Sequence, residues 1–457
     1  MKIVSLPYGS RHIELAVPDS ADVSTPPPAV PLSAADAVRR SLTEPIGSAR
    51  LSELAISCRT AAVVVSDNTR PVPYKGSAGI LEPILEILKQ QHVAEIKIIV
   101  ATGTHRPMTG SELKNMLGPA AFGAGIRVIN HVATDPDMLR SIGRTDRTAE
   151  VTVNRHYLDA DLKIITGLVE PHFMAGFSGG RKAVCPGICG LSVSYGFHSA
   201  SILDHPRSTT LILDGNPCHN ESLRIAEMAG VDFAVNVTLD SQKRLTGIFS
   251  GQLQQSHQLA VEHLCHYATV RLQHPYDLVI TQTGDVGVNH YQCAKAAYEV
   301  ARVISPIGSI VMLGDLADLD PVGSRNYKDV LAQLARLGTV PFLEKIVRPD
   351  WVFIPEQWQV QMWAQVFVRT GTPRNVFLCA AQLEDYPTHL TPDDNVAARS
   401  RRPAGCSNLD FTRQITQDTI GTIIKANPDA RILVHPDGPY TIPILQNPDS
   451  RPKGKIS

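Results

Sequence analysis

Short apolar runs recur along the chain, and several of them end in glycine or in polar residues. They cover 61–71, 95–107, 161–172, 276–285, 308–315 and 431–439. Within these runs the apolar residues follow one another without regular polar alternation. That pattern is typical of strands buried on both faces of a parallel or mixed sheet.

Between two of these runs the apolar residues repeat with helical spacing. In 79–91, the residues Ile80, Ile84, Ile87 and Leu88 follow the spacing of one apolar helix face. Strands that alternate with helices predict an α/β fold, with sheets flanked by helices. In such folds the loops after the carboxyl ends of the strands hold the reactive groups.

The length of 457 residues predicts two domains, because one hydrophobic core does not grow that large. A boundary is expected near 268–275, just before a new strand. We therefore predict an N-terminal catalytic and cofactor-binding domain at 1–272 and a C-terminal α/β domain at 273–430. A C-terminal strand and tail follow at 431–457, and the active site is expected in the cleft between the domains.

The composition describes a soluble globular protein, with 43% hydrophobic and 19% charged residues. The net charge of −1 gives no electrostatic reason to expect a nucleic-acid or membrane partner. The chain begins without a signal-peptide pattern and has no apolar run near the roughly 18 residues of a membrane span. The eight cysteines form no CxxC pair, which favours reduced thiols and a cytoplasmic location.

Two of the sixteen histidines stand out, because His105 and His172 each follow a buried strand beside glycine. A histidine in that place can exchange protons near neutral pH, although a hydrogen-bonded loop role is the alternative for each. Asp67 and Arg70 follow the preceding strand. The arginine is suited to grip a carboxylate and the aspartate to orient an imidazole, whereas a turn with a surface ion pair is the alternative.

The segment 167–187, GLVEPHFMAGFSGGRKAVCPG, places His172 before a glycine-rich run and a lysine. It is not a Walker phosphate loop, because Arg181 separates Gly180 from Lys182. Glycine-rich backbone that enters a helix can still bind an anion through free N–H groups. Lys182 is a candidate phosphate contact or nucleophile, and a solvated surface lysine is the alternative.

Several segments together resemble the lactate racemase family of nickel-pincer 2-hydroxyacid racemases and epimerases. They are DNTRP, ATGTHR, the block at 167–187, the later His198, YQCAKAA and EQWQ, in the family's order. The resemblance extends from about Asp67 to Trp358. It implies a nickel-dependent isomerase that acts on a small 2-hydroxy acid and relies on cofactor-synthesis enzymes in the cell.

The resemblance also implies a cofactor, a pyridinium-3-thioamide-5-thiocarboxylic acid mononucleotide that holds nickel through two sulfurs and a ring carbon. Lys182 matches the family's covalent attachment point, with Gly179 and Gly180 beside it. His198 matches the remaining nickel ligand, and a neutral imidazole suits that metal.

Further roles follow from the same resemblance. His105 and His172 match the acid–base pair on opposite sides of the substrate, with Asp67 and Arg70 beside them. The residues that match the family's substrate contacts are Arg70, Tyr291, Gln292, Lys295 and Trp358.

The implied chemistry accounts for these residue types. The α-hydrogen of a 2-hydroxy carboxylate is a poor acid, so it leaves more easily as hydride, and only a cofactor can accept hydride. A base near neutral pH must take the hydroxyl proton, and inversion requires a second base on the other side. Arg70 and Lys295 are the candidates to hold the carboxylate.

One loop departs from the family pattern. TQTGDVGVNHYQ, with Asp285, Gly287 and His290, stands where lactate-specific members have a GGYPLD-like loop, and Tyr74 is expected to add bulk near Arg70. A sugar acid or a dicarboxylate is therefore at least as well supported as lactate. Two other classes stay open: a zinc hydrolase or lyase that uses the same histidines, and a hydroxy-acid-binding homologue without catalysis.

Overall fold

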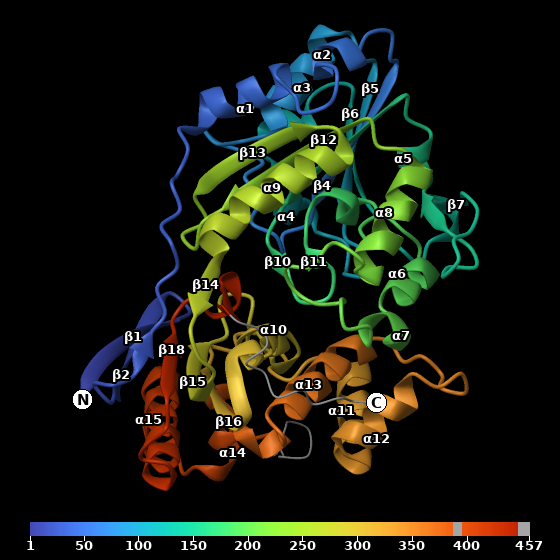
Figure 1. Ribbon diagram of the computed structural model, residues 1–457. Helices are drawn as coiled ribbons and strands as arrows, with labels where there is room; N and C mark the ends of the chain where they lie inside the picture. The colour runs from blue at the N-terminus through green and yellow to red at the C-terminus, as the bar shows by residue number, and fades with distance from the viewer. Residues whose placement is uncertain (387–394, 447–457) are drawn as a thin grey trace. The chain divides into compact units, whose positions relative to one another are not determined.

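The computed structural model describes residues 1–386 and 395–446, and the chain forms two compact units (Figure 1). The first unit is Pro28–His266, and the second combines Met1–Pro27 with Tyr267–Ser457. The first 27 residues thus join the second unit, whereas the sequence pattern predicts that they belong to the N-terminal domain. The reason is a strand pairing between β3 (Asp22–Val23) and β18 (Ile432–His435).

The Pro28–His266 unit is built on a six-stranded sheet with the order β13-β12-β9-β4-β5-β6. All neighbours pair in parallel except β13, which runs antiparallel to β12. The strands are β4 (Thr60–Ser66), β5 (Glu95–Ala101), β6 (Ile126–Asn130), β9 (Leu162–Leu168), β12 (Phe233–Leu239) and β13 (Leu245–Gly251). The apolar runs that begin at 61, 95 and 161 form its central strands, as predicted.

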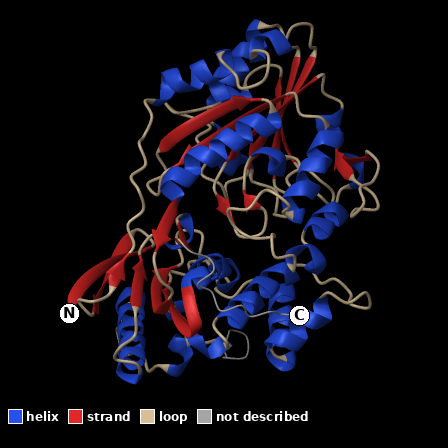
Figure 2. Cartoon of the chain, viewed as in Figure 1, coloured by secondary structure: helices blue, strands red, loops and turns tan. Residues whose placement is uncertain are grey.

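Helices cover this sheet, and Figure 2 shows them as a layer against the strands. α1 (Ala34–Thr43), α2 (Leu51–Leu54) and α3 (Leu81–Gln90) pack on one face through a single apolar core. The predicted helix at 79–91 is confirmed as α3, whose buried residues recur three and four apart. The unit also contains α4 (Gly110–Leu117), α5 (Arg155–Leu158), α6 (Leu191–Phe197), α7 (Ala200–Leu203), α8 (Pro217–Ala229), most of α9 (Leu253–Ala268) and the pair β7 (Leu139–Ser141) and β8 (Thr152–Asn154).

The second unit has a five-stranded, all-parallel sheet with the order β17-β16-β15-β18-β3. The runs predicted at 276–285, 308–315 and 431–439 form its strands β15 (Tyr276–Gln282), β16 (Ile304–Leu313) and β18. The other elements are β1 (Lys2–Tyr8), β2 (Arg11–Val17), β14 (Thr269–Leu272), β17 (Val376–Cys379), β19 (Ile442–Leu445), α10 (His290–Val300), α11 (Arg325–Leu337), α12 (Thr339–Ile346), α13 (Gln357–Arg369), α14 (Val396–Arg399) and α15 (Asn408–Ala426).

The α/β fold class with parallel and mixed sheets is therefore confirmed. The predicted C-terminal strand corresponds to β18 and β19, and the tail after residue 446 lies outside the described residues. No helix in the described parts of the chain is long and apolar enough to cross a membrane.

Parallel pairing determines where the candidate site residues lie. Because β4, β5 and β9 run in the same direction, the loops that follow them emerge at one edge of the sheet. After β9 the chain forms a short hairpin of β10 (Pro171–His172) and β11 (Gly176–Phe177), and then one turn of 3-10 helix, η3 (Gly180–Ala183). η3 carries Lys182 to this edge.

A tight turn at Gly179 fixes the start of η3. Its φ of 73° lies in the left-handed region, which L side chains rarely adopt. A Cβ at this position would lie 2.7 Å from Val169 Cγ2 and 3.0 Å from the carbonyl oxygen of Leu168. The turn therefore requires glycine for both its backbone conformation and its close approach to the end of β9.

We expect Gly179→Ala to lower the free energy of unfolding by about 2 kcal/mol or more, because left-handed backbone strain and steric overlap add. Gly110→Ala is the matched control, since a Cβ there meets nothing within 4 Å and its φ is ordinary. That change should stay within about 0.5 kcal/mol. Urea denaturation of the two variants and the parent compares them, and equal losses would contradict the assignment of strain to Gly179.

Candidate active site

Asp67 and His105 meet at the edge where β4 and β5 end. His105 Nδ1 lies 2.7 Å from Asp67 Oδ2. The aspartate side chain is only 6% exposed, whereas the imidazole is 56% exposed. The carboxylate thus orients the ring through Nδ1, which leaves Nε2 as the nitrogen that can exchange protons.

The Asp67 carboxyl is held in its ionised form. Burial alone would raise its pKa, but the hydrogen bond and charge of His105 and the hydrogen bonds from Thr69 outweigh burial and lower that pKa. Thr69 donates to Asp67 Oδ1 from its backbone nitrogen at 3.1 Å and from its hydroxyl at 2.5 Å. The ionised carboxylate therefore stays available to hold the His105 ring in place.

Arg70 has a partner that the sequence patterns did not suggest. Its Nε lies 3.2 Å from Oε1 of Glu170, in the loop after β9, and both side chains are partly exposed. Glu170 is the single acidic residue in the segment 167–187, and that isolation was the available signal. The ion pair orients the guanidinium group at the same edge of the sheet as His105.

His172 lies against Lys182, and its hydrogen bonds define its protonation. Its Nδ1 accepts from the backbone nitrogens of Met174 at 3.3 Å and Ala175 at 3.2 Å. The proton of the neutral ring therefore sits on Nε2, which lies 3.0 Å from Lys182 Nζ. Nε2–H can donate to Lys182 only if the lysine is an uncharged amine with a lone pair.

The surroundings of Lys182 also favour its uncharged amine form. Burial and then the positive charges of Arg70 and Arg181 lower the pKa of Lys182 to about 7. Its Nζ lies 5.1 Å from the centre of the Phe197 ring. A large fraction of Lys182 is thus a free amine near neutral pH, which is the nucleophilic form.

His198 lies at the end of α6 and stays neutral. Burial and the nearby charge of Lys182 lower its pKa to about 3. Its Nδ1 lies 2.8 Å from the carbonyl oxygen of Ser194, so Nδ1–H donates and the lone pair is on Nε2. A neutral imidazole with this tautomer is suited to donate to a metal.

The protein itself supplies few metal donors. The described residues contain no group of three or more His, Cys, Asp or Glu side chains that could hold a metal ion.

In the second unit the structure brings Tyr291 and Trp358 together, since the indole Nε1 donates to the Tyr291 hydroxyl at 2.8 Å. Gln292 and Lys295 are three residues apart on α10 and share a face of that helix. The buried Oε1 of Gln292 has no hydrogen-bond partner among the described residues.

Two residues expected to shape the substrate pocket belong to the core instead. Tyr74 is buried, and its hydroxyl accepts from Ser66 N at 2.6 Å and lies 2.9 Å from Thr166 Oγ1, so it joins β4 to β9. His290 is fully buried, and its Nδ1 lies 2.7 Å from the Tyr327 hydroxyl. Hydrogen-bond partners distant in the sequence draw both side chains inward, so Tyr74 adds no bulk to a pocket, whereas the role of the loop that contains His290 stays a prediction.

The candidate residues of the Pro28–His266 unit thus form one neighbourhood. The charge of Arg70 acts on Lys182, and the charges of Lys182 and His105 act on His198. The loops supply two imidazoles that can exchange protons, a neutral amine and an imidazole suited to a metal. Gly179 and Gly180 form the buried turn that leads to Lys182.

Comparison with known proteins shows what the chain is similar to. Residues 8–210 match the family described as Lactate racemase N-terminal domain. The chain is 32% identical over 378 residues to the lactate racemase of Lactiplantibacillus plantarum, covering 80% of this chain and 87% of that protein. It is 29% identical over 389 residues to the lactate racemase of Thermoanaerobacterium thermosaccharolyticum, covering 80% and 86%.

Solved structures extend the likeness to the fold. The lactate racemase apoprotein from Thermoanaerobacterium thermosaccharolyticum superposes with a TM-score of 0.81 at 27% identity, over 97% of this chain and all of that one. A Thermotoga maritima protein shares the fold with a TM-score of 0.63 at 18% identity, over 91% of this chain and all of that one. With a relative 32% identical over four fifths of its length, the chain belongs to the lactate racemase family, a family of isomerases.

Proposed function

We propose that the protein inverts the α-carbon of a 2-hydroxy carboxylic acid, using a nickel-pincer pyridinium mononucleotide tethered to Lys182. The observation that carries the proposal is the contact between His172 and Lys182, beside the Asp67–His105 pair. That arrangement provides a nucleophilic attachment point and two imidazoles within one unit of a lactate racemase relative.

The residues present fit such a cofactor. Lys182 offers a free amine for the covalent link, and His198 offers one neutral nitrogen donor. A pincer ligand brings its own sulfur and carbon donors, which agrees with the absence of a three-residue metal cluster among the described residues. When bound, the group supplies an electrophilic carbon that can accept and return the α-hydrogen as hydride.

The protein's own part is proton transfer at the hydroxyl oxygen. We assign His105 and His172 to opposite sides of the substrate, where one removes the hydroxyl proton and the other returns a proton after the carbonyl turns over. His105 is supported in this role by Asp67, which orients its ring through Nδ1. Once the lysine is acylated, the His172 Nε2 no longer faces a free amine, so it can serve the substrate.

Charge must also hold the substrate carboxylate in place. Arg70 is the candidate in the first unit, because Glu170 keeps its guanidinium oriented while part of it stays exposed. Tyr291, Gln292, Lys295 and Trp358 are proposed as the substrate contacts of the second unit. The loop around His290 differs from that of the lactate-specific members, so we propose a sugar acid or dicarboxylate alongside lactate as candidate substrates.

A zinc hydrolase or lyase is the competing function. Catalytic zinc takes three protein ligands in most enzymes of that kind, and the described residues contain no such group. The competing function also requires no covalent role for Lys182. The free-amine state of that lysine favours the racemase.

The proposal is tested with full-length protein made alongside its cofactor-synthesis enzymes. A panel of single-enantiomer 2-hydroxy acids is assayed by chiral chromatography, and intact mass spectrometry measures the adduct. We expect conversion of at least one acid to its mirror image or epimer and an added mass on Lys182, both of which Lys182→Ala abolishes. Activity restored by zinc alone in Lys182→Ala protein would establish the competing function.

The roles of the histidines predict separate outcomes. His105→Ala and His172→Ala should each lower the turnover rate by about a hundredfold or more, since general acid–base groups contribute that much, while nickel content stays nearly intact. His198→Ala should instead deplete nickel, measured by elemental analysis of the purified protein. His12→Ala, an exposed change on β2, is the control for both readouts. Loss of nickel in His105→Ala with full nickel in His198→Ala would reverse the assignment.

The lowered pKa of Lys182 predicts the pH at which it reacts. In cofactor-free protein, brief labelling with an amine reagent, read by peptide mass spectrometry, should reach half its maximum at Lys182 near pH 7, whereas an ordinary lysine amine has a pKa of about 10.4. Arg70→Met removes a positive charge that opposes the ammonium form, so the midpoint should rise. An unchanged midpoint in Arg70→Met, or a wild-type midpoint near 10, would contradict this account.

A further inference from the structure

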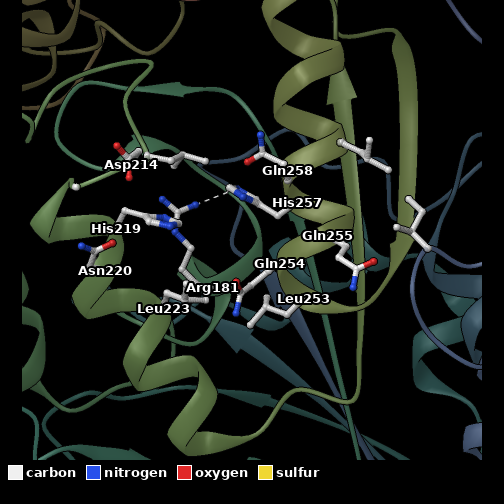
Figure 3. Close-up of a pocket in the computed structure, with 14 residues that line it drawn as sticks. Arg181, Asp214, His219, Asn220, Leu223, Leu253, Gln254, Gln255, His257 and Gln258 are labelled. Carbon is white, nitrogen blue, oxygen red and sulfur yellow. Dashed lines mark hydrogen bonds between the residues drawn. The ribbon is translucent and has the colours of Figure 1, made fainter.

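A cavity with a volume of about 830 Å³ lies in the Pro28–His266 unit. Its walls come from α8, α9, the turn at 213–215 and the side chain of Arg181, as Figure 3 shows. Lys182, His105, His172 and His198 are not among the residues that line it. The cavity is therefore separate from the proposed cofactor site, although Arg181 and Lys182 are consecutive in the chain.

Arg181 forms part of this wall with its charge nearly excluded from water, since the residue is 1% exposed. Its Nη2 donates to the carbonyl oxygens of Ala175 at 2.8 Å and Phe177 at 2.9 Å. Its Nη1 lies 2.9 Å from His257 Nε2, and Nε has no hydrogen-bond partner among the described residues. A guanidinium group carries five N–H donors, so these contacts leave two of them without an acceptor.

The contact with His257 satisfies an N–H of Arg181 only in one of the two tautomers of the His257 ring. His257 Nε2 also lies 2.8 Å from the carbonyl oxygen of Ser178. A neutral imidazole nitrogen either donates to that carbonyl or accepts from Arg181, and it cannot do both. If it donates to Ser178, a third N–H of the guanidinium group has no acceptor.

No carboxylate balances the charge of Arg181. Among the described residues, none forms an ion pair with it, and a buried unpaired charge is costly. Asp214, the acidic residue that lines the cavity, is 99% exposed and pairs with Arg207 at 3.1 Å. Burial lowers the pKa of Arg181 only to about 9, so the group stays charged at neutral pH.

Apart from Asp214, the polar side chains that line the cavity beside Arg181 are imidazoles and amides, which include hydrogen-bond donors. Burial and then the positive charge of Arg181 lower the pKa of His219 to about 3. Its buried Nδ1 has no partner among the described residues. Figure 3 shows the amide side chains of Asn220, Gln254 and Gln258 around the same space.

We propose that this cavity binds a small molecule bearing an oxyanion, either a phosphate or a carboxylate, which the charge of Arg181 attracts. The unpaired buried cation supplies the attraction, and the surrounding neutral amides and imidazoles supply donors without adding repulsion. The argument for this site does not depend on the racemase function, because none of the residues in the proposed catalytic roles lines the cavity.

Two probes test the proposal on the full-length chain: inorganic phosphate and malonate. Isothermal titration calorimetry and thermal unfolding are measured at constant ionic strength, with sodium chloride as the reference. We expect saturable binding of at least one probe and a rise in the unfolding temperature. A response to phosphate alone indicates a phosphate-bearing ligand, and a response to malonate alone indicates a carboxylate-bearing one.

Matched variants locate the binding. Asn220→Asp adds a negative charge to the cavity wall with little change of shape, and should weaken binding of the active probe at least tenfold. Asn115→Asp makes the same change on α4, beside Lys75 and away from the cavity, and should leave binding unchanged. Arg181→Met should abolish binding.

Because Arg181 also holds backbone carbonyls, its replacement removes stabilising hydrogen bonds as well as the charge, and the Asn220→Asp comparison decides the question on its own. The proposal is overturned if neither probe binds, if chloride has the same effect, or if Asn220→Asp binds as tightly as the parent. The last result places the anion elsewhere, such as at the glycine turn beside Lys182.

Discussion

The excess of positive over negative groups at one edge of the first sheet is the constraint that shapes this protein. Burial lowers the pKa of Lys182 most, and the charges of Arg70 and Arg181 lower it further. The two carboxylates at this edge, Asp67 and Glu170, are already paired with His105 and Arg70. Burial together with this excess of positive charge favours the free amine of Lys182 and the neutral imidazole of His198, the forms that the proposed attachment and metal-binding roles require.

The parallel sheet brings these charged groups close together. Three loops from β4, β5 and β9 must end at one edge because their strands run the same way. The left-handed turn at Gly179 then brings η3 back over the end of β9, so that Lys182 meets His172 from the same stretch of chain. The hydrogen bond between them couples the protonation of an acid–base candidate to that of the attachment point.

The sequence predicted the parts of this arrangement that depend on local pattern. Apolar runs identified β4, β5, β9, β15, β16 and β18, and the family motifs named Asp67, His105, His172 and Lys182, which the structure joins in two contacts within the Pro28–His266 unit. Pairings between distant segments were not predictable in the same way. The strand β3 pairs with β18, about four hundred residues later in the chain. Tyr74 and His290 point into the core because they form hydrogen bonds with Thr166 and Tyr327. The role of Glu170 became evident only from its ion pair with Arg70.

Arg181 and Lys182 show how one short helix serves two sites. In a 3-10 helix, successive side chains point about 120° apart, so adjacent residues face different surroundings. Lys182 faces His172, whereas Arg181 lines the cavity between α8 and α9. The charge of Arg181 nevertheless reaches Lys182 and helps to keep it uncharged. An anion bound against Arg181 would offset that charge and raise the pKa of Lys182, so occupancy of one site would alter the reactivity of the other without any change of backbone.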